Sequence, residues 1–584
     1  MGVVKGGSFL ITTVEPAEVF TPEDFNEEHR LVAETVADFT RNVVVPRAEE
    51  LEEQKPGLMA DLLRRAAQLG LLSADIPEEY GGQALDKISS LLITENLVAG
   101  GSFAVAHGAH TGIGTLPIVF FGTEEQKARY LPLLASGARL AAYALTEPGA
   151  GSDALAARTR AVLSPDGKHY LLNGTKQFIT NGGIADLFIT YAKVDGERFT
   201  AFIVDRDSEG VSTGVEEKKM GIKGSSTCSL ILENARVPVE NVLGEVGRGH
   251  VVAFNILNIG RLKLAAGCVG SCKLALQVSA RYAMEREQFG RPIARFGLIQ
   301  EKLARMAAGT YAAESMLYRT GGLIDKTLAG AGPGGRDVAS AIAEWAIECS
   351  INKVFASEAL DFAADEAVQI FGGYGYIQEY PVERIYRDSR INRIFEGTNE
   401  INRLLIPGTL LRRAMKGELP LLAAAQRVGR EVMEASMPAT MPEETPLGAE
   451  ELMVETAKKI FLLVGGLAAQ KYLQSLENEQ EILGILADQA IAIFAMESSV
   501  ARALKALRRG DPGLKVELAR AFVHEAFPRV ELLAREALGA MFAGDELRTY
   551  LAVLRRLARI NPIDLIGLRR KVAEAVLAAG AYQV

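Results

Sequence analysis

The sequence predicts a mainly helical protein with a central antiparallel β domain and an additional helical domain at its end. Apolar residues recur at spacings of three and four in residues 21–139, 250–413 and 451–584, which is the spacing of one helix face. Residues 141–244 differ, because short apolar runs alternate there with Asp-Gly and Asn-Gly pairs, which are strong signals for hairpin turns. A chain of 584 residues also exceeds one ordinary core, so several packed units are expected.

The order of these regions predicts the domain organisation. Residues 21–24 start the first helical region, with proline in the first turn and acidic residues beside it. Residues 437–448 are rich in proline, methionine and acidic side chains, which is typical of a linker. We therefore expect a helical domain at 1–140, a β domain at 141–249, a helical bundle at 250–413, a linker at 414–449 and a C-terminal helical domain at 450–584.

The composition is that of a soluble globular protein and argues against several classes. With 64 basic and 73 acidic residues, the formal charge is -9, whereas a dedicated nucleic-acid binder needs a basic face. The four cysteines form no C-x-x-C pair and the histidines no H-E-x-x-H pattern, so no metal site is expected. Cys268 and Cys272 should share one face of a buried helix. This cysteine usage fits a reducing compartment, and we expect a cytoplasmic protein.

Membrane insertion is not predicted. The first 16 residues lack the charged region, apolar core and cleavage site of a signal peptide. Residues 97–122 carry no formal charge but contain six glycines and two histidines. They predict two buried helices around a turn rather than a membrane span. Peripheral contact with a membrane stays open.

Two familiar motif types are set aside. Residues 210–214 match the G-x-S-x-G pattern of a nucleophilic serine, but that motif needs a buried strand before it and a helix after it. Charged residues flank it here, so a polar loop is expected. No G-x-G-x-x-G opens a helix after a strand, and no phosphate-binding G-x-x-x-x-G-K-[ST] is present.

Three segments carry residues suited to chemistry. Residues 143–153 form a loop with Pro, Gly and hydroxyl groups that could approach a flat polar ligand closely, or could simply connect two domains. Residues 177–183 end a strand in a turn that presents an aromatic ring and a threonine, or are an ordinary hairpin with an exposed Phe. The third segment is residues 387–403, RDSRINRIFEGTNEINR.

Glu396 is the candidate base in the third segment. It lies between apolar Phe395 and the flexible pair Gly397 and Thr398. A carboxylate beside apolar surface has its charged form disfavoured, so its pKa rises toward a value useful for a general base. The alternative is a surface glutamate at a helix start, with Thr398 or Asn399 as the cap.

Together these segments resemble the acyl-CoA dehydrogenase family. YALTEPGAGSD, QFITNGG, REQFGRPI, QIFGGYGY and RIFEGTNEINR occur in the family's order, and the resemblance covers residues 24–411. EKKMGIKGS and FGLIQEKLARM are similar to the very-long-chain branch, which carries an extra C-terminal helical domain. The resemblance implies an α-helical domain, a β-barrel-like domain and a four-helix bundle.

The resemblance implies FAD as the cofactor, bound without a Rossmann fold. It places beside the flavin Tyr143, Leu145, Thr146, Ser152, Phe178, Ile179, Thr180, Thr398 and Glu400. It places against the FAD of a neighbouring subunit Arg286, Gln288 and Phe289, and at the adenine end Gln369, Gly372 and Gly373. Shared FAD sites imply a homodimer or homotetramer.

The resemblance also implies the reaction. Glu396 would remove a proton from the carbon next to the thioester of an acyl-CoA, while hydride leaves the next carbon for the flavin. The product is a trans-2-enoyl-CoA of fatty-acid β-oxidation, and electrons pass to an electron-transfer flavoprotein. Some family members place the base immediately before an arginine on a helix. That arginine matches Arg261 here, and the residue before it is Gly260, so Glu396 is the expected base.

Substrate contacts follow from the same resemblance. They are Ser152, Asn258, Arg261, Gly397, Gly108 and Ala109. Medium-chain members tend to have Asp at the position of Asn258, which leaves its contact with CoA open. Gly108 and Ala109 would leave a deeper slot than the large polar residues of medium-chain members, suited to long chains. Small residues there could instead only let two helices pack closely.

Two further functions and one surface stay open at this point. An acyl-CoA oxidase would pass electrons to oxygen, and a catalytically idle scaffold would keep only the fold. In the C-terminal domain a basic cluster could contact membrane or be a solvated helix face: Arg555, Arg556, Arg559, Arg569, Arg570 and Lys571.

Overall fold

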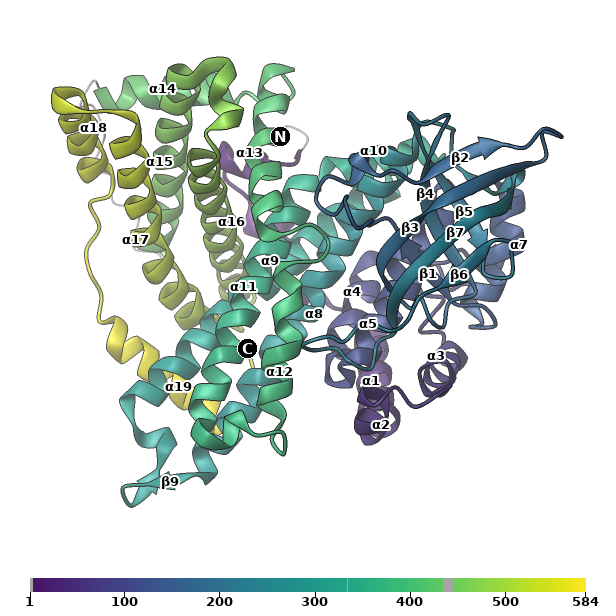
Figure 1. The fold of residues 1–584 in the computed structure, drawn as a ribbon. Helices are drawn as coiled ribbons and strands as arrows, with labels where there is room; N and C mark the ends of the chain where they lie inside the picture. The colour runs from purple at the N-terminus through teal and green to yellow at the C-terminus, as the bar shows by residue number, and fades with distance from the viewer. Residues whose placement is uncertain (1–3, 333, 434–445) are drawn as a thin grey trace.

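The computed structural model describes residues 4–332, 334–433 and 446–584, and it confirms the predicted fold class (Figure 1). The first region is helical. Its helices are α1 (Glu27–Phe39), α2 (Ala48–Glu52), α3 (Leu58–Gln68), α4 (Lys87–Asn96), α5 (Ser102–Gly108), α6 (Leu116–Phe121) and α7 (Glu124–Ala135). Apolar residues spaced three and four positions apart explain these helices, as in α3, which buries Leu58, Leu62 and Ala66 on one face.

The β region forms one sheet in the order β6-β7-β3-β2-β4-β5-β8, with β1 paired to β4. The strands are β1 (Ala141–Ala144), β2 (Arg160–Leu163), β3 (His169–Thr180), β4 (Leu187–Val194), β5 (Arg198–Asp205), β6 (Val211–Thr213), β7 (Thr227–Pro238) and β8 (Val242–Leu243). The predicted hairpin at Asp195-Gly196 joins β4 to β5, and both residues have positive φ. The sheet is not purely antiparallel as expected, because β4 pairs in parallel with β1 and β2.

Long helices form the bundle beside this sheet. They are α8 (Gly249–Glu285), α9 (Gly297–Ala329), α10 (Gly335–Glu344), α11 (Ala346–Phe371), α12 (Pro381–Ser389) and α13 (Asn399–Met415). A small hairpin, β9 (Glu287–Gln288) and β10 (Arg291–Pro292), projects between α8 and α9. Figure 1 places this hairpin at the end of the bundle that lies away from the sheet.

The C-terminal region is also helical. Its helices are α14 (Leu421–Met433), α15 (Gly448–Tyr472), α16 (Gln480–Arg508), α17 (Lys515–Met541), α18 (Gly544–Leu557) and α19 (Leu565–Ala579). The expected linker at 414–449 therefore contains a helix, α14, which buries Ala424, Val428 and Val432 in the adjoining core. Residues 434–445 of that linker lie outside the described residues.

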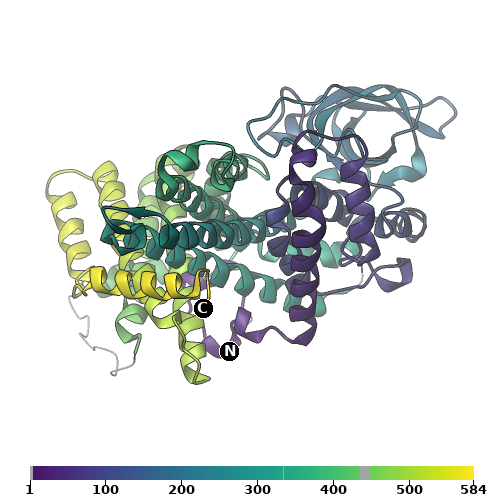
Figure 2. The same ribbon diagram turned by 90° about the horizontal axis from the view of Figure 1, so that it is seen from below.

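The N-terminal segment packs onto the C-terminal region and α19 packs onto the bundle (Figure 2). The ring of Phe9 lies 4.9 Å from that of Phe494 on α16, in an edge-on arrangement. Helix α19 packs against α9, and Tyr582 after it reaches Glu314 in the bundle. The C-terminal region is thus joined to the bundle through a shared core.

Three helical stretches are apolar and long enough to cross a membrane: Ser102–Phe121, Gly249–Glu285 and Gln480–Arg508. Between 72% and 83% of their most apolar windows is buried inside the protein, so core contacts already take up these faces. Residues 97–122 are buried as predicted, but not as two helices around a central turn. The turn precedes them at Gly101, and a π-helical segment, Ala109–Gly114, continues α5 into α6. A side chain at Gly114 would meet Ala141 at 2.8 Å.

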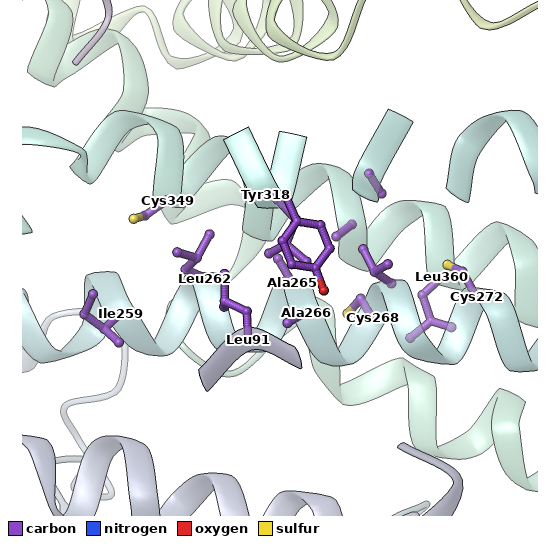
Figure 3. Packing of buried hydrophobic residues seen from close by; sticks show 14 of the residues in the cluster. Leu91, Ile259, Leu262, Ala265, Ala266, Cys268, Cys272, Tyr318, Cys349 and Leu360 are labelled. Atoms are coloured by element: carbon purple, nitrogen blue, oxygen red, sulfur yellow. The ribbon is translucent and has the colours of Figure 1, made fainter. Parts of the chain in front are cut away.

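Helix α8 runs through the largest core cluster. Figure 3 shows Leu262, Ala265 and Cys268 of α8 packed near Tyr318. The prediction for Cys268 and Cys272 is confirmed, because both are buried on α8 with free thiols. The opposite side of α8 faces the site.

Candidate active site

Glu396 lies in a strained loop between a short 3-10 helix, Arg390–Arg393, and α13. Its φ is 58° and that of Gly397 is 81°, so two consecutive residues adopt the left-handed conformation. That conformation is unfavourable for a residue with a side chain and is kept only where the surroundings impose it. Thr398 is the cap of α13, and its Oγ1 accepts from the Ile401 amide at 3.3 Å. Thr398 is therefore the helix cap, as the alternative interpretation of this segment expected. That interpretation also expected Glu396 on the surface, and it does not lie there.

Three side chains impose the loop's conformation. The Arg261 Nε donates to the Glu396 carbonyl at 3.1 Å. The carbonyl of Gly397 accepts from the Lys353 Nζ at 2.8 Å and from the Asn402 Nδ2 at 2.9 Å. All three donors are buried.

The Glu396 carboxyl is withdrawn from water. Its Oε2 is buried and has no hydrogen-bond partner among the described residues. Burial raises the pKa of Glu396 to about 7, although the charges of Arg261 and Lys353 lower it. A Cβ at Gly260 would lie 2.8 Å from Oε2. Gly260 therefore makes room for this carboxyl, and the two base positions implied by the family converge on one point.

A cavity of about 220 Å³ opens beside the carboxyl. Along α8 it is lined at helical spacing by Gly260, Leu264, Gly267, Ser271 and Leu274. Gly108 and Ala109 line it from the opposite side, and a Cβ at Gly108 would meet nothing within 4 Å. Both residues therefore line this cavity, and their role as the end of an acyl slot stays a prediction.

The sheet contributes a second wall. Thr180, at the end of β3, lines the cavity. Next to it Phe178 has φ 58° and is 59% exposed, although it belongs to a strand, while Ile179 is buried. Tyr143 and Leu145 are buried at the end of β1, and the Thr146 carbonyl accepts from the Gln177 amide at 2.9 Å.

A buried ion pair fixes the loop after β1. The Lys176 Nζ lies 2.8 Å from Glu147, whose carboxylate also accepts from the Arg158 and Thr159 amides. Beyond this anchor, Ser152 is exposed and a Cβ at Gly149 or Gly151 would meet nothing within 4 Å. The open loop and the exposed ring of Phe178 fit a large flat group with a polar edge.

The remaining predicted cofactor residues lie elsewhere. Arg286, Gln288 and Phe289 belong to the projecting hairpin, far from the sheet of their own chain (Figure 1). Phe289 is 93% exposed with φ 54°. The Arg286 guanidinium lies 5.5 Å from the ring centre of Tyr374, which brings the hairpin beside the exposed Gln369, Gly372 and Gly373. One chain therefore holds two separate groups of these residues.

Two predicted substrate contacts have structural partners. Asn258 is buried, and its Oδ1 accepts from the Arg261 Nη1 at 2.9 Å. Arg261 thus donates hydrogen bonds both to Asn258 and to the carbonyl of Glu396. Gly397 lies in the loop, while Glu400 is exposed on the first turn of α13.

Lys353 and Asn402 are the site residues that sequence reasoning missed. Asn402 belongs to the recognised third segment, but its distance from the chemistry depends on the loop. Lys353 had one signal, because it is the single lysine of the segment that forms α11.

The basic cluster of the C-terminal domain is divided between α18, the segment after it that contains Arg559, and α19. Arg569 binds Glu525 and Glu301, and Lys571 binds Glu517. These pairings favour the solvated helix face over a membrane patch.

Comparison with known proteins agrees with this geometry. The chain matches the family models described as "Acyl-CoA dehydrogenase, N-terminal domain" at residues 26–138 and "middle domain" at 142–235. It matches "Acyl-CoA dehydrogenase, C-terminal domain" at 247–411 and a second such model at 456–556.

Relatives extend over the whole chain. A probable acyl-CoA dehydrogenase of Bacillus subtilis is 54% identical over 100% of this chain and 99% of its own. The very long-chain specific acyl-CoA dehydrogenase of Bos taurus is 38% identical over 82% of this chain and 76% of its own. The crystal structure of an acyl-CoA dehydrogenase complexed with FAD from Bacillus anthracis is 56% identical, covers 100% of both chains and superposes with a TM-score of 0.98. The chain belongs to the acyl-CoA dehydrogenase family, a family of oxidoreductases that act on CH–CH bonds.

Proposed function

We propose that this protein is an FAD-dependent dehydrogenase of long-chain acyl-CoA that forms trans-2-enoyl-CoA in fatty-acid β-oxidation. The observation that carries the proposal is the placement of the Glu396 carboxyl, whose buried Oε2 has no partner among the described residues, beside a cavity that Gly108, Gly260 and Gly267 help to line. Electron-transfer flavoprotein is the acceptor, and the protein works in the cytoplasm.

Glu396 performs the proton transfer. Its pKa of about 7 leaves a large share of the carboxyl ionised at neutral pH while keeping it basic. Arg261, Lys353 and Asn402 hold its backbone, so the carboxyl meets the substrate without reorganisation. Phe178 and Thr180 would help to hold FAD, which would supply the hydride acceptor.

The length of the cavity supports long chains. Its lining residues on α8 run from Gly260 to Leu274, which spans roughly 21 Å at 1.5 Å per residue. An extended alkyl chain advances roughly 1.3 Å per carbon, given C–C bonds of about 1.5 Å. The wall of α8 therefore accommodates an acyl chain of roughly sixteen carbons.

The two separate groups of cofactor residues support an oligomer. The exposed hairpin with Arg286 and Phe289 lies at the end of the bundle away from the sheet that carries Phe178 (Figure 1). A second copy of the chain would bring the hairpin to the FAD of its neighbour, giving at least a dimer.

Anaerobic titration with palmitoyl-CoA tests the function. The flavin absorbance should bleach near one equivalent per site. A yellow protein that no straight-chain or branched acyl-CoA bleaches would contradict the proposal. Mixing the reduced protein with electron-transfer flavoprotein or with oxygen then identifies the acceptor, and rapid peroxide formation would show an oxidase instead.

Gly267→Leu tests the chain length. Its Cβ has room, 4.0 Å from Thr94, and the side chain would fill the cavity about 10 Å along α8 from Gly260. We expect kcat/KM for palmitoyl-CoA to fall about tenfold or more, while hexanoyl-CoA is little affected. Gly408→Leu on α13 is the matched control, since a Cβ there also meets nothing within 4 Å and Gly408 does not line the cavity. Equal losses with both substrates would contradict the assignment of this cavity to the acyl chain.

A further inference from the structure

Lys353 on α11 is a buried cation next to the catalytic loop. Its side chain is fully buried. Its Nζ donates to the Gly397 carbonyl at 2.8 Å and to the Asn399 Oδ1 at 2.7 Å. Both acceptors are neutral oxygen atoms that flank the start of α13.

Other buried lysines of this protein have a different environment. Lys176 lies 2.8 Å from Glu147, Lys458 lies 2.7 Å from Glu497, and Lys505 lies 2.5 Å from Asp24. Each is compensated by a carboxylate at contact distance. A buried ammonium held only by neutral oxygens is costly, and burial lowers the pKa of Lys353 to about 8. The cost of burying this ammonium suggests that Lys353 has a function at this position.

The contacts of Lys353 with the loop around Glu396 indicate that function. Gly397 follows Glu396, and both adopt the left-handed conformation. The Gly397 carbonyl is fixed by Lys353 and Asn402, and the Glu396 carbonyl by Arg261. Lys353 is therefore both a clamp on the loop and a positive charge near its carboxyl.

We propose that Lys353 is a positioning residue for the reaction, which holds the loop so that Glu396 faces the cavity and favours the ionised form of Glu396. This inference rests on the proposed function, because it assumes that Glu396 is the base. Lys353 itself touches neither the substrate cavity nor the reacting atoms.

The charged and titratable groups around Glu396 come from three elements. Arg261 on α8 and Lys353 on α11 favour its ionised form, and Tyr143 on β1 faces it as a neutral phenol whose pKa burial raises far above the ordinary value. The charges of Cys268, Arg261 and Glu400 in turn affect the pKa of Lys353. Removal of Lys353 leaves Arg261 as the remaining cation, so the pKa of Glu396 should rise further above 7.

Lys353→Met is the decisive variant, because it keeps the length of the side chain and removes its charge and donors. Variant and parent, both loaded with FAD, are mixed anaerobically with palmitoyl-CoA, and the rate of flavin bleaching is followed from pH 5.5 to 9. We expect the limiting rate to fall between about tenfold and a hundredfold, since the base is no longer held. The midpoint of the rise of rate with pH should move up by about one unit.

Two further variants separate the clamp from the charge. Asn402→Leu removes the second donor to the Gly397 carbonyl but no charge, so the rate should fall while the pH midpoint stays. Lys458→Met removes an equally buried ammonium in the C-terminal domain. It should lower thermal stability and leave both kinetic measures unchanged.

The outcomes distinguish this inference from the function beneath it. A parent protein that no acyl-CoA bleaches would overturn both. An active parent whose Lys353→Met variant keeps its rate within about twofold and its pH midpoint would overturn the role of Lys353 alone. If Lys353→Met does not retain FAD, Asn402→Leu decides, and an unchanged rate in that variant overturns the clamp.

Discussion

Glu396 and Glu314 are both buried carboxyls of the helical bundle, and their environments are opposite. Glu314 on α9 accepts from Lys273, from the Arg502 Nη1 at 2.5 Å and from the Tyr582 Oη at 2.8 Å. These partners hold its pKa well below the ordinary value despite burial. Glu396 has a buried oxygen without a donor, and burial raises its pKa to about 7.

The difference shows how one fold gives two buried carboxyls pKa values on opposite sides of the ordinary value. Glu314 connects α9 to α8, to α16 and to the last residues of the chain, so its charge is used in joining domains. Glu396 receives backbone support only, through the carbonyls of the loop. Side-chain donors to the loop carbonyls fix its position, while its Oε2 has no hydrogen-bond partner among the described residues.

Glu396→Gln should have the largest effect on this comparison. The amide keeps the shape but cannot accept the proton, so flavin reduction by palmitoyl-CoA should slow on the order of 10³–10⁴-fold. Flavin absorbance and the melting temperature check that the variant is folded. Glu418→Gln, an exposed carboxyl, is the control. A variant that kept full dehydrogenation would rule out Glu396 as the base.

Glu314→Gln should affect the fold instead. It removes the counter-ion that Lys273 and Arg502 share, although these keep Glu95 and Glu23, so the free energy of unfolding should fall by about 1.5–3 kcal/mol at pH 7.5. Because the folded pKa of Glu314 is lowered, its contribution is present above pH 4.5 and is lost as the pH falls below that value. Denaturant unfolding measures it, and activity per folded molecule should be retained. A loss below about 1 kcal/mol would show that the network contributes little.

The smallest effect concerns the stability of the Glu396→Gln variant. The folded pKa of Glu396 is raised, so its protonated form favours folding below pH 4.5, and this contribution is lost as the pH rises through about 7. At pH 8.5 the ionised parent should therefore be less stable than the variant, by about 1–3 kcal/mol. At pH 5 the two should unfold alike. Equal stability at both pH values would contradict the withdrawal of this carboxyl from water.

Much of the site was predictable because it is carried by local motifs. The loop of residues 143–153, the strand end at Thr180 and the candidate base at Glu396 were recognisable from short segments with restrictive glycines. The resemblance places the hairpin around Phe289 against a neighbouring subunit, and this stays a prediction; the structure shows Phe289 exposed on a hairpin away from the sheet (Figure 1).

Other features depended on contacts between distant residues. Lys353 and Gly397 are 44 positions apart, and Tyr582 and Glu314 are 268 apart. The parallel pairing of β4 with β1 and β2 also joins strands that are not neighbours in sequence. Helix α14 was missed because the proline-rich composition that follows it extended the expected linker over its amphipathic face.

The sequence by itself determined the reaction class and the fold class, since both reside in hydrophobic periodicity and in short segments whose residue types are constrained locally. Only the tertiary structure decided how the two buried carboxyls differ, because Glu396 has an oxygen without a donor among the described residues while Glu314 is bound by Lys273, Arg502 and Tyr582. A pKa depends on what is buried around a group and on which donors reach it, and those neighbours are brought together by folding.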